Sequence, residues 1–173
     1  VEVLLSRNYE VTFSTSMADE ILPDRKWLRH EFPPRVSDRN PVFFVTICCQ
    51  ERGRNQLTTD EMWAFLFESI EKRNLDGVWI CRLFVAMPDH VHGIFSFEGA
   101  DQMKTVIPHW KRWVAREKGI TWQKGFFDHR LRNDASAREK REYILQNPVR
   151  AGLVEKPSDW RYQFNPFKDE EAR

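Results

Sequence analysis

Residues 78–97 read VWICRLFVAMPDHVHGIFSF, two apolar runs on either side of Pro88-Asp89. Both runs are rich in β-branched and aromatic residues, and the Pro-Asp pair between them is typical of a turn, so two consecutive strands are expected. Alternate side chains of a strand share a face. His90 and His92 should therefore point to one side of the sheet, while their apolar neighbours point into the core.

Periodic segments on either side of this pair extend the pattern to an α+β domain. The expected elements are a strand at 42–49, a helix from Thr58 or Thr59 to 74, strands at 78–87 and 90–97, a helix at 101–118, a short strand or loop at 125–131, and a helix from Asn133 or Asp134 to Asn147-Pro148. The order β-α-β-β-α-β-α predicts a ferredoxin-like (RRM-like) antiparallel sheet with helices on one face and an extra C-terminal helix.

Composition excludes several classes of protein. The 173 residues contain no apolar run of the roughly 18 residues that a bilayer-spanning helix needs, so no membrane association is expected. The three cysteines include an adjacent pair and no CxxC spacing, which argues against a disulfide framework and a zinc ribbon. We therefore expect a cytoplasmic protein.

Positive charge is concentrated in residues 101–150, where twelve basic and six acidic side chains give a net charge of +6, against +1 for the whole chain. Basic side chains interleaved with aromatic ones suit a nucleic acid with exposed bases, although a solvated helix face over core aromatics has the same composition. The candidate DNA-binding residues are Lys104, Lys111, Arg112, Arg116, Lys124, Arg130 and Arg132. Asp128 and His129 are candidates for supporting roles around the site.

Two patterns carry candidate chemistry. His90 and His92 would supply half of a metal site, although two surface histidines would give the same pattern. On the last predicted helix, Tyr143 shares a polar face with Asn147, one turn further along. The plain alternatives are a partly buried tyrosine and an asparagine that ends the helix before Pro148.

Three segments together resemble the REP-associated tyrosine transposases, members of the HUH superfamily of single-strand, single-tyrosine transposases and nickases. They are MPDHVHGIFSF (87–97), WQKGFFDHRLR (122–132) and REYILQNPVRAGLV (141–154), in the family's order and spacing. The resemblance extends over about residues 24–163. It implies a transposase domain at 24–166, preceded by an extension at 1–23 that is disordered or reflects a misassigned start, and followed by a charged tail at 167–173.

The resemblance also implies roles for individual residues. His90 and His92 would bind a divalent metal ion, and Asn147 would complete the metal site. Tyr143 would be the nucleophile that forms a 5′-phosphotyrosine and leaves a free 3′-OH. Mg²⁺ or Mn²⁺ suits a site with open positions for phosphate oxygens and water. The implied partner is single-stranded DNA with hairpin or palindromic repeats, bound by a monomer or a homodimer.

Three functions remain open at this point. The first is a metal-dependent endonuclease and strand-transferase that cuts single-stranded DNA at hairpin-forming repeats through Tyr143. The second is a relative that binds single-stranded DNA or RNA without cutting it. The third is a hydrolase whose metal ion, held by His90 and His92, activates water. The presence of both histidines, the tyrosine and Asn147 together argues against the second, and the family resemblance favours the first.

Overall fold

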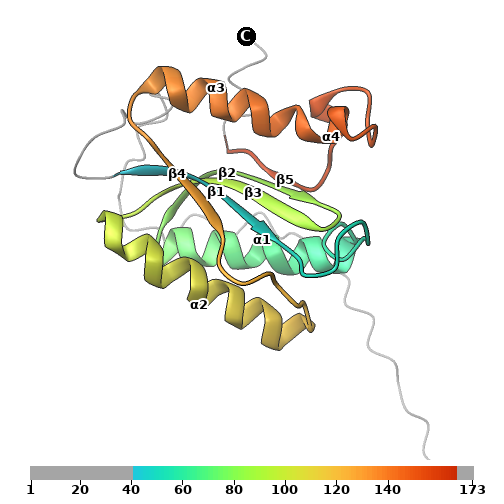
Figure 1. Ribbon diagram of the computed structural model, residues 1–173, viewed down its shortest axis with the longest axis horizontal. Coiled ribbons are helices and arrows are strands. Elements are labelled where there is room, and N and C mark those ends of the chain that lie inside the picture. Colours follow the sequence, from blue (N-terminus) through green and yellow to red (C-terminus); the bar gives the residue numbers. More distant parts are fainter. Residues whose placement is uncertain (1–40, 167–173) are drawn as a thin grey trace, which may run out of the picture. The chain divides into compact units, whose positions relative to one another are not determined.

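The computed structural model describes residues 41–166, which form an antiparallel sheet covered by helices (Figure 1). The predicted extension at 1–23, the start of the predicted domain and the tail at 167–173 lie outside the described residues. The elements are β1 (Val42–Cys48), α1 (Asp60–Leu75), β2 (Ile80–Met87), β3 (His90–Ser96), α2 (Ala100–Lys118), β4 (Phe127–Leu131), α3 (Asp134–Leu145), α4 (Asn147–Arg150), a 3-10 turn (Pro157–Asp159) and β5 (Gln163–Phe164).

The sheet has five strands in the order β4-β1-β3-β2-β5, and each neighbouring pair is antiparallel. The predicted α+β antiparallel fold is therefore confirmed, and the uncertain segment 125–131 contains a strand. The short strand β5 was not predicted; it adds to the edge of the sheet beside β2. None of the helices within 41–166 is long and apolar enough to cross a membrane.

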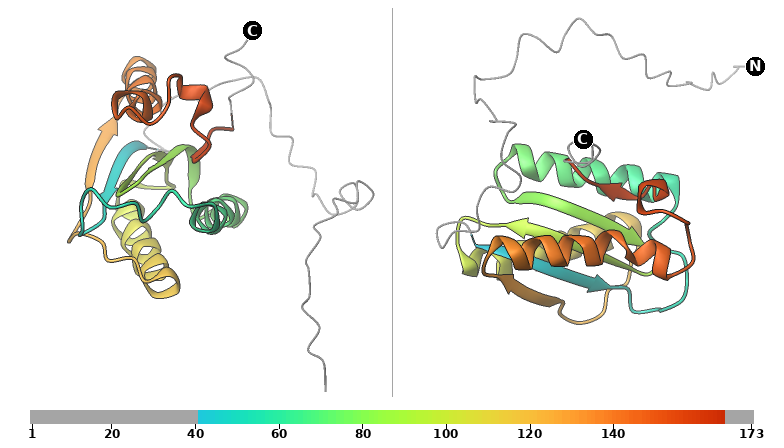
Figure 2. Two further views of the ribbon diagram at one scale, coloured as in Figure 1. Left: turned by 90° about the vertical axis from the view of Figure 1, so that its right-hand side faces the viewer. Right: turned by 90° about the horizontal axis from the view of Figure 1, so that it is seen from above.

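The two faces of the sheet carry separate apolar cores. One core packs beneath α1 and α2 and includes Ile47, Phe84 and Phe95, whereas the other lies beneath α3 and includes Phe44 and Ile144. Figure 2 (left) shows α3 on one side of the sheet and the two longer helices on the other. The predicted arrangement, with two helices on one face and an additional C-terminal helix, is present.

Local sequence signals explain where the helices begin and end. Thr59 caps α1 by accepting a hydrogen bond from the backbone N–H of Met62. Asn133 caps α3 in a reciprocal pair with Ser136, and Gly119 ends α2 with φ of 68°, a conformation that glycine adopts without strain. Pro108 lies inside α2, which begins well before it, as the predicted helix at 101–118 requires.

Candidate active site

Two histidines of β3 lie on the face of the sheet that α3 covers. The ring centroids of His90 and His92 are 4.8 Å apart and the rings are nearly perpendicular. His92 is only 5% exposed, and Val91 between them belongs to the core on the opposite face. The alternating orientation predicted from the sequence is therefore confirmed.

An oxygen atom lies beside the Nδ1 atom of each imidazole. His90 Nδ1 is 2.6 Å from Asp89 Oδ1, and His92 Nδ1 is 2.8 Å from the hydroxyl oxygen of Thr46 on β1. The Asp89 carboxylate can only accept, so it favours a proton on Nδ1 of His90, and the Thr46 hydroxyl can accept from the same tautomer of His92. The lone pair of Nε2 is then available for a metal ion, as in metal sites whose histidines donate their other N–H to an oxygen.

The surroundings keep both imidazoles neutral. Burial lowers the pKa of His92 to about 3, helped by the charges of His90 and Arg52. Burial also lowers the pKa of His90, although the hydrogen bond to Asp89 and its charge oppose this. Burial would raise the pKa of Asp89, but the N–H of Gly53, His90 and Arg52 together hold it below its usual value. Neutral imidazole is the form that binds metals.

Tyr143 of α3 lies next to this pair. Its ring centroid is 6.1 Å from that of His92 and 6.3 Å from that of Phe44 on β1, which in turn stacks on His92 at 5.6 Å. The side chain is 39% exposed, so the phenol is accessible, as the helix pattern predicts. Residues from β1, β3 and α3 thus form one aromatic cluster with a tyrosine at its surface.

Two cationic side chains flank the phenol. Lys140 Nζ lies 5.1 Å from the centroid of the Tyr143 ring and 5.2 Å from that of Phe44. The guanidinium carbon of Arg150, from α4, lies 5.0 Å from the Tyr143 ring. Cations over aromatic faces are attracted by the ring quadrupole. They also place two positive charges beside the Tyr143 ring.

Asn147 uses one end of its side chain to end α3. Its Nδ2 donates to the backbone carbonyls of Tyr143 at 2.8 Å and Ile144 at 3.4 Å. The side chain thus caps the last carbonyls of α3, although the helix ends at Leu145, before the predicted Asn147-Pro148, and Asn147 begins α4. Because Nδ2 faces these carbonyls, Oδ1 is the atom that a cation would use, and the role of Asn147 as a metal ligand stays a prediction.

The residues present fit a divalent cation with mixed ligands. Within 41–166 no three His, Cys, Asp or Glu side chains come together as a metal site. Two neutral imidazoles and one amide oxygen would leave several positions of an octahedral ion open. Such a donor set suits a cation that takes its remaining ligands from a substrate phosphate and water.

Comparison of the whole chain with known proteins shows the family to which it belongs. No family model matches the chain. The REP-associated tyrosine transposase of Escherichia coli (strain K12) is 31% identical over 135 residues, which cover 76% of this chain and 79% of that protein. The chain belongs to the REP-associated tyrosine transposases.

Further relatives agree with this assignment. A relative from Haemophilus influenzae, assigned to the same family, is 30% identical to the transposase over 141 residues, which cover 70% of this chain and 77% of that protein. A solved structure of a REP-associated tyrosine transposase bound to a REP hairpin is 28% identical, with a TM-score of 0.65 over 83% of this chain and 86% of the other. The protein is therefore an enzyme of the tyrosine transposase class.

The predicted DNA-binding residues on α2 lie on the other side of the sheet from Tyr143. Lys104, Arg112 and Arg116 are exposed on α2, which covers the opposite face of the sheet (Figure 1). Lys111 is only 8% exposed, and its ammonium donates to the carbonyls of Gln123, at 2.9 Å, and Gly125. Burial lowers the pKa of Lys111. Its position is that of a structural residue, which does not fit the predicted contact with DNA.

The remaining candidates lie on or near β4 in the transposase. In the register with β1, His129 pairs with Phe44 and so shares the face of the active site. The other supporting candidate, Asp128, pairs with Val45 on the opposite face. The remaining candidates for DNA contact are also exposed, and they are Lys124, Arg130 and Arg132.

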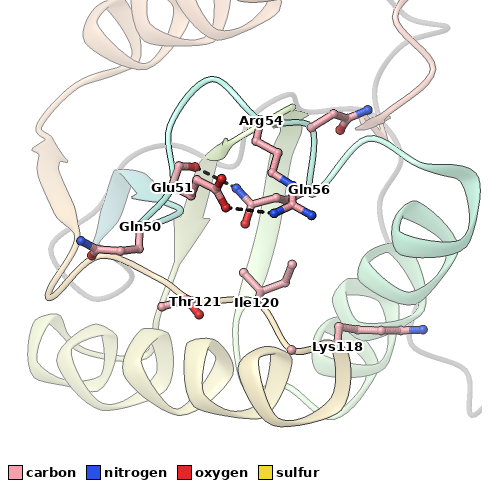
Figure 3. A pocket seen from close by; sticks show the side chains of 9 residues that line it. Gln50, Glu51, Arg54, Gln56, Lys118, Ile120 and Thr121 are labelled. Atoms are coloured by element: carbon pink, nitrogen blue, oxygen red, sulfur yellow. Dashed lines mark hydrogen bonds and ion pairs between the residues drawn. The ribbon is translucent and has the colours of Figure 1, made fainter.

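Two surface cavities of the transposase lie away from this cluster. Gln50, Glu51 and Lys118 line one of about 580 Å³, in which Glu51 pairs with Arg54 at 3.1 Å and its carbonyl accepts from Gln56 (Figure 3). The other lies between α2 and residues 119–126, and Arg112 and Lys124 are among its lining residues. None of the candidate catalytic or metal-binding residues lines either cavity.

Sequence reasoning missed several residues that touch the site: Thr46, Asp89, Lys140 and Arg150. Asp89 immediately precedes His90, and a carboxylate beside a candidate ligand is a signal that could have been used. Lys140 is one helical turn before Tyr143, which is also visible in the sequence. The pairing of Thr46 with His92 depends on strand register, which local sequence does not reveal.

Proposed function

We propose that this transposase binds single-stranded DNA at hairpin-forming repeats and cleaves one phosphodiester bond with Tyr143 as the nucleophile. The observation that carries the proposal is the accessible phenol of Tyr143 beside His92, within one cluster built from β1, β3 and α3. Support for the substrate comes from the solved relative, which is bound to a REP hairpin.

The proposed reaction is a transesterification. The phenolic oxygen of Tyr143 attacks the phosphorus, its proton passes to solvent, and the O3′ atom leaves and takes up a proton. One P–O bond forms and one breaks, so the 5′-phosphotyrosine retains the energy of the ester, and a 3′-OH can later attack it and rejoin the strand. Lys140 and Arg150, about 5 Å from the phenol ring, favour the anionic phosphate next to the nucleophile.

His90, His92 and Asn147 are the residues that would hold Mg²⁺ or Mn²⁺. A bound cation would supply charge neutralisation at the non-bridging phosphate oxygens. The protein's own contribution is to hold the imidazoles neutral and oriented, through Asp89 and Thr46. Orientation of this kind lowers the entropic cost of aligning the phosphate with the tyrosine.

A covalent-trapping assay tests the proposal. Single-stranded DNA from the repeats that flank the gene is labelled on the 3′ side of the cut, incubated with protein and Mg²⁺ or Mn²⁺, and run on a denaturing gel. We expect a labelled protein band that disappears with a chelator, with duplex DNA and with Tyr143→Phe. Tyr162→Phe is the matched control, because the Tyr162 hydroxyl bonds Asp60 rather than the site.

The alternatives give different results in the same assay. Cutting that survives Tyr143→Phe would identify water as the nucleophile and the protein as a hydrolase that uses His90 and His92. Binding without cutting, over all hairpin substrates and both metals, would identify a relative that only binds nucleic acid.

A further inference from the structure

Phe127 is exposed to an unusual degree for its size. Among residues 41–166 the large exposed hydrophobic side chains are Leu75, Ile80, Phe127, Tyr143 and Leu153. Phe127 is 60% exposed and is the one phenylalanine in this group. Because solvent exposure of a phenyl ring is unfavourable, a ligand that stacked on Phe127 would gain binding energy from covering it.

The strand register places Phe127 at the active site. Phe127 pairs with Thr46, whose hydroxyl lies beside His92, and therefore shares the face of the sheet that carries the site. Its ring centroid lies 6.0 Å from that of Phe44, which also contacts Tyr143 at 6.3 Å. The rings of Phe127 and Tyr143 are thus no more than about 12 Å apart, with Phe44 between them.

Charge around this ring matches a polyanion. Lys140 Nζ lies 5.2 Å from the centroid of Phe44, the ring against which Phe127 packs, and the guanidinium carbon of Arg150 lies 5.0 Å from the ring of Tyr143. An exposed aromatic ring near cations is the combination that binds unpaired nucleotides, because rings stack on bases while cations neutralise phosphates.

Pairing of β4 with another copy of the chain is less well supported. β4 is an edge strand, and an exposed edge is a template for pairing. However, β4 carries two exposed charged side chains, Asp128 and Arg130, and charged side chains on an edge strand disfavour edge-to-edge contacts. The Phe127 ring also packs on Phe44, across the face of the sheet rather than out from its edge.

We infer that Phe127 is a stacking platform for one unpaired nucleobase near the cleaved phosphodiester. This inference rests on the proposed function and adds a base-binding subsite to it. For a strand that runs stacked between the two rings, at about 3.4 Å per base, the base on Phe127 lies about four nucleotides or fewer from the phosphate at Tyr143. Because every base has an aromatic face, the subsite tolerates different bases at this position.

The experiment measures equilibrium binding of the hairpin oligonucleotide in the presence of a chelator, so that no cleavage is needed. Each unpaired nucleotide is replaced in turn by an abasic site. For the wild type we expect one abasic position to weaken binding about tenfold. The Phe127→Ala variant should bind the intact DNA about tenfold more weakly than the wild type. Removal of that same base should not weaken its binding further. Phe127→Trp should restore binding.

Leu75→Ala is the matched control, since Leu75 is 83% exposed on α1, away from the site. Thermal unfolding checks that each variant is folded, and Phe127→Leu replaces Phe127→Ala if the latter is not. The inference is overturned if Phe127→Ala binds like the wild type, if its effect adds to every abasic substitution, or if it changes the oligomeric mass, which would assign Phe127 to an interface between copies.

Failure of the proposed function is recognised separately. If the wild type forms no covalent adduct but one abasic position still weakens binding only when Phe127 is present, DNA binding through Phe127 is supported and the cleavage chemistry is refuted. If the adduct forms and the Phe127 variants behave like the wild type, only the stacking subsite is refuted.

Discussion

Thr46→Val tests whether the contact between β1 and His92 orients a metal ligand. The two residues are directly paired across the sheet, and Thr46 Oγ1 lies 2.8 Å from His92 Nδ1. Valine has the shape of threonine and favours strands, so the substitution removes the hydroxyl with little change in packing. The structure therefore allows one hydrogen bond to be removed on its own.

The expected effect falls on the metal-bound form. A metal on Nε2 requires the proton of His92 on Nδ1, and a buried N–H without an acceptor costs about 1–3 kcal/mol. In the metal-free protein the imidazole can carry its proton on the other nitrogen, so most of this cost is avoided. We expect Mn²⁺ affinity to fall about 10–100-fold, while the free energy of unfolding without metal changes by less than about 1 kcal/mol.

Calorimetric titration with Mn²⁺ measures the affinity, and urea unfolding in chelator measures the stability. Thr46→Ser keeps a hydroxyl at the same position and should retain most of the affinity. Unchanged Mn²⁺ binding in Thr46→Val would refute the reasoning. Equal losses of stability with and without metal would also refute it, because the hydroxyl would then support the fold rather than the ligand.

Three further outcomes are expected. In urea unfolding without metal, the free energy of unfolding of the wild type should fall by about 2 kcal/mol relative to His92→Gln between pH 6.5 and 5. The reason is that His92 takes up a proton in the unfolded chain, whereas in the folded protein the buried imidazole, with its pKa near 3, stays neutral. Parallel pH profiles for the two proteins would contradict this. Lys140→Gln and Arg150→Gln should each slow single-turnover cleavage about tenfold, and a loss of DNA affinity alone would instead make them binding residues. Gly93→Ala should destabilise by about 1–3 kcal/mol, since a methyl group there meets the buried ring of Phe95; an unchanged urea midpoint would show that the ring can move.

The sequence predicts elements with local signals well and long-range placement poorly. The strand containing His90 and the cap at Asn133 follow from alternation and from a short polar motif. β5 is only two residues long, and its pairing with β2 depends on the chain returning after α4, so no periodicity marks it.

The same limit explains the candidate site. Residue type and spacing made His90, His92 and Tyr143 candidates, the family resemblance implied their roles, and the structure brings them together. Lys111 was predicted to contact DNA because the sequence shows its charge but not its burial. The carbonyls that accept hydrogen bonds from it belong to residues after α2. Arg150 was missed because it meets Tyr143 only after the chain turns into α4.

Mutations in the two separate apolar cores should have different effects on the candidate site. The larger core beneath α1 and α2 contains no candidate catalytic side chain, whereas the smaller core, with Leu131 and Ile144, holds the helix that carries Tyr143 against the sheet. A packing defect in the smaller core would move Tyr143 away from the histidines and leave the larger core intact. A single substitution there could therefore abolish the proposed cleavage while the domain stays folded.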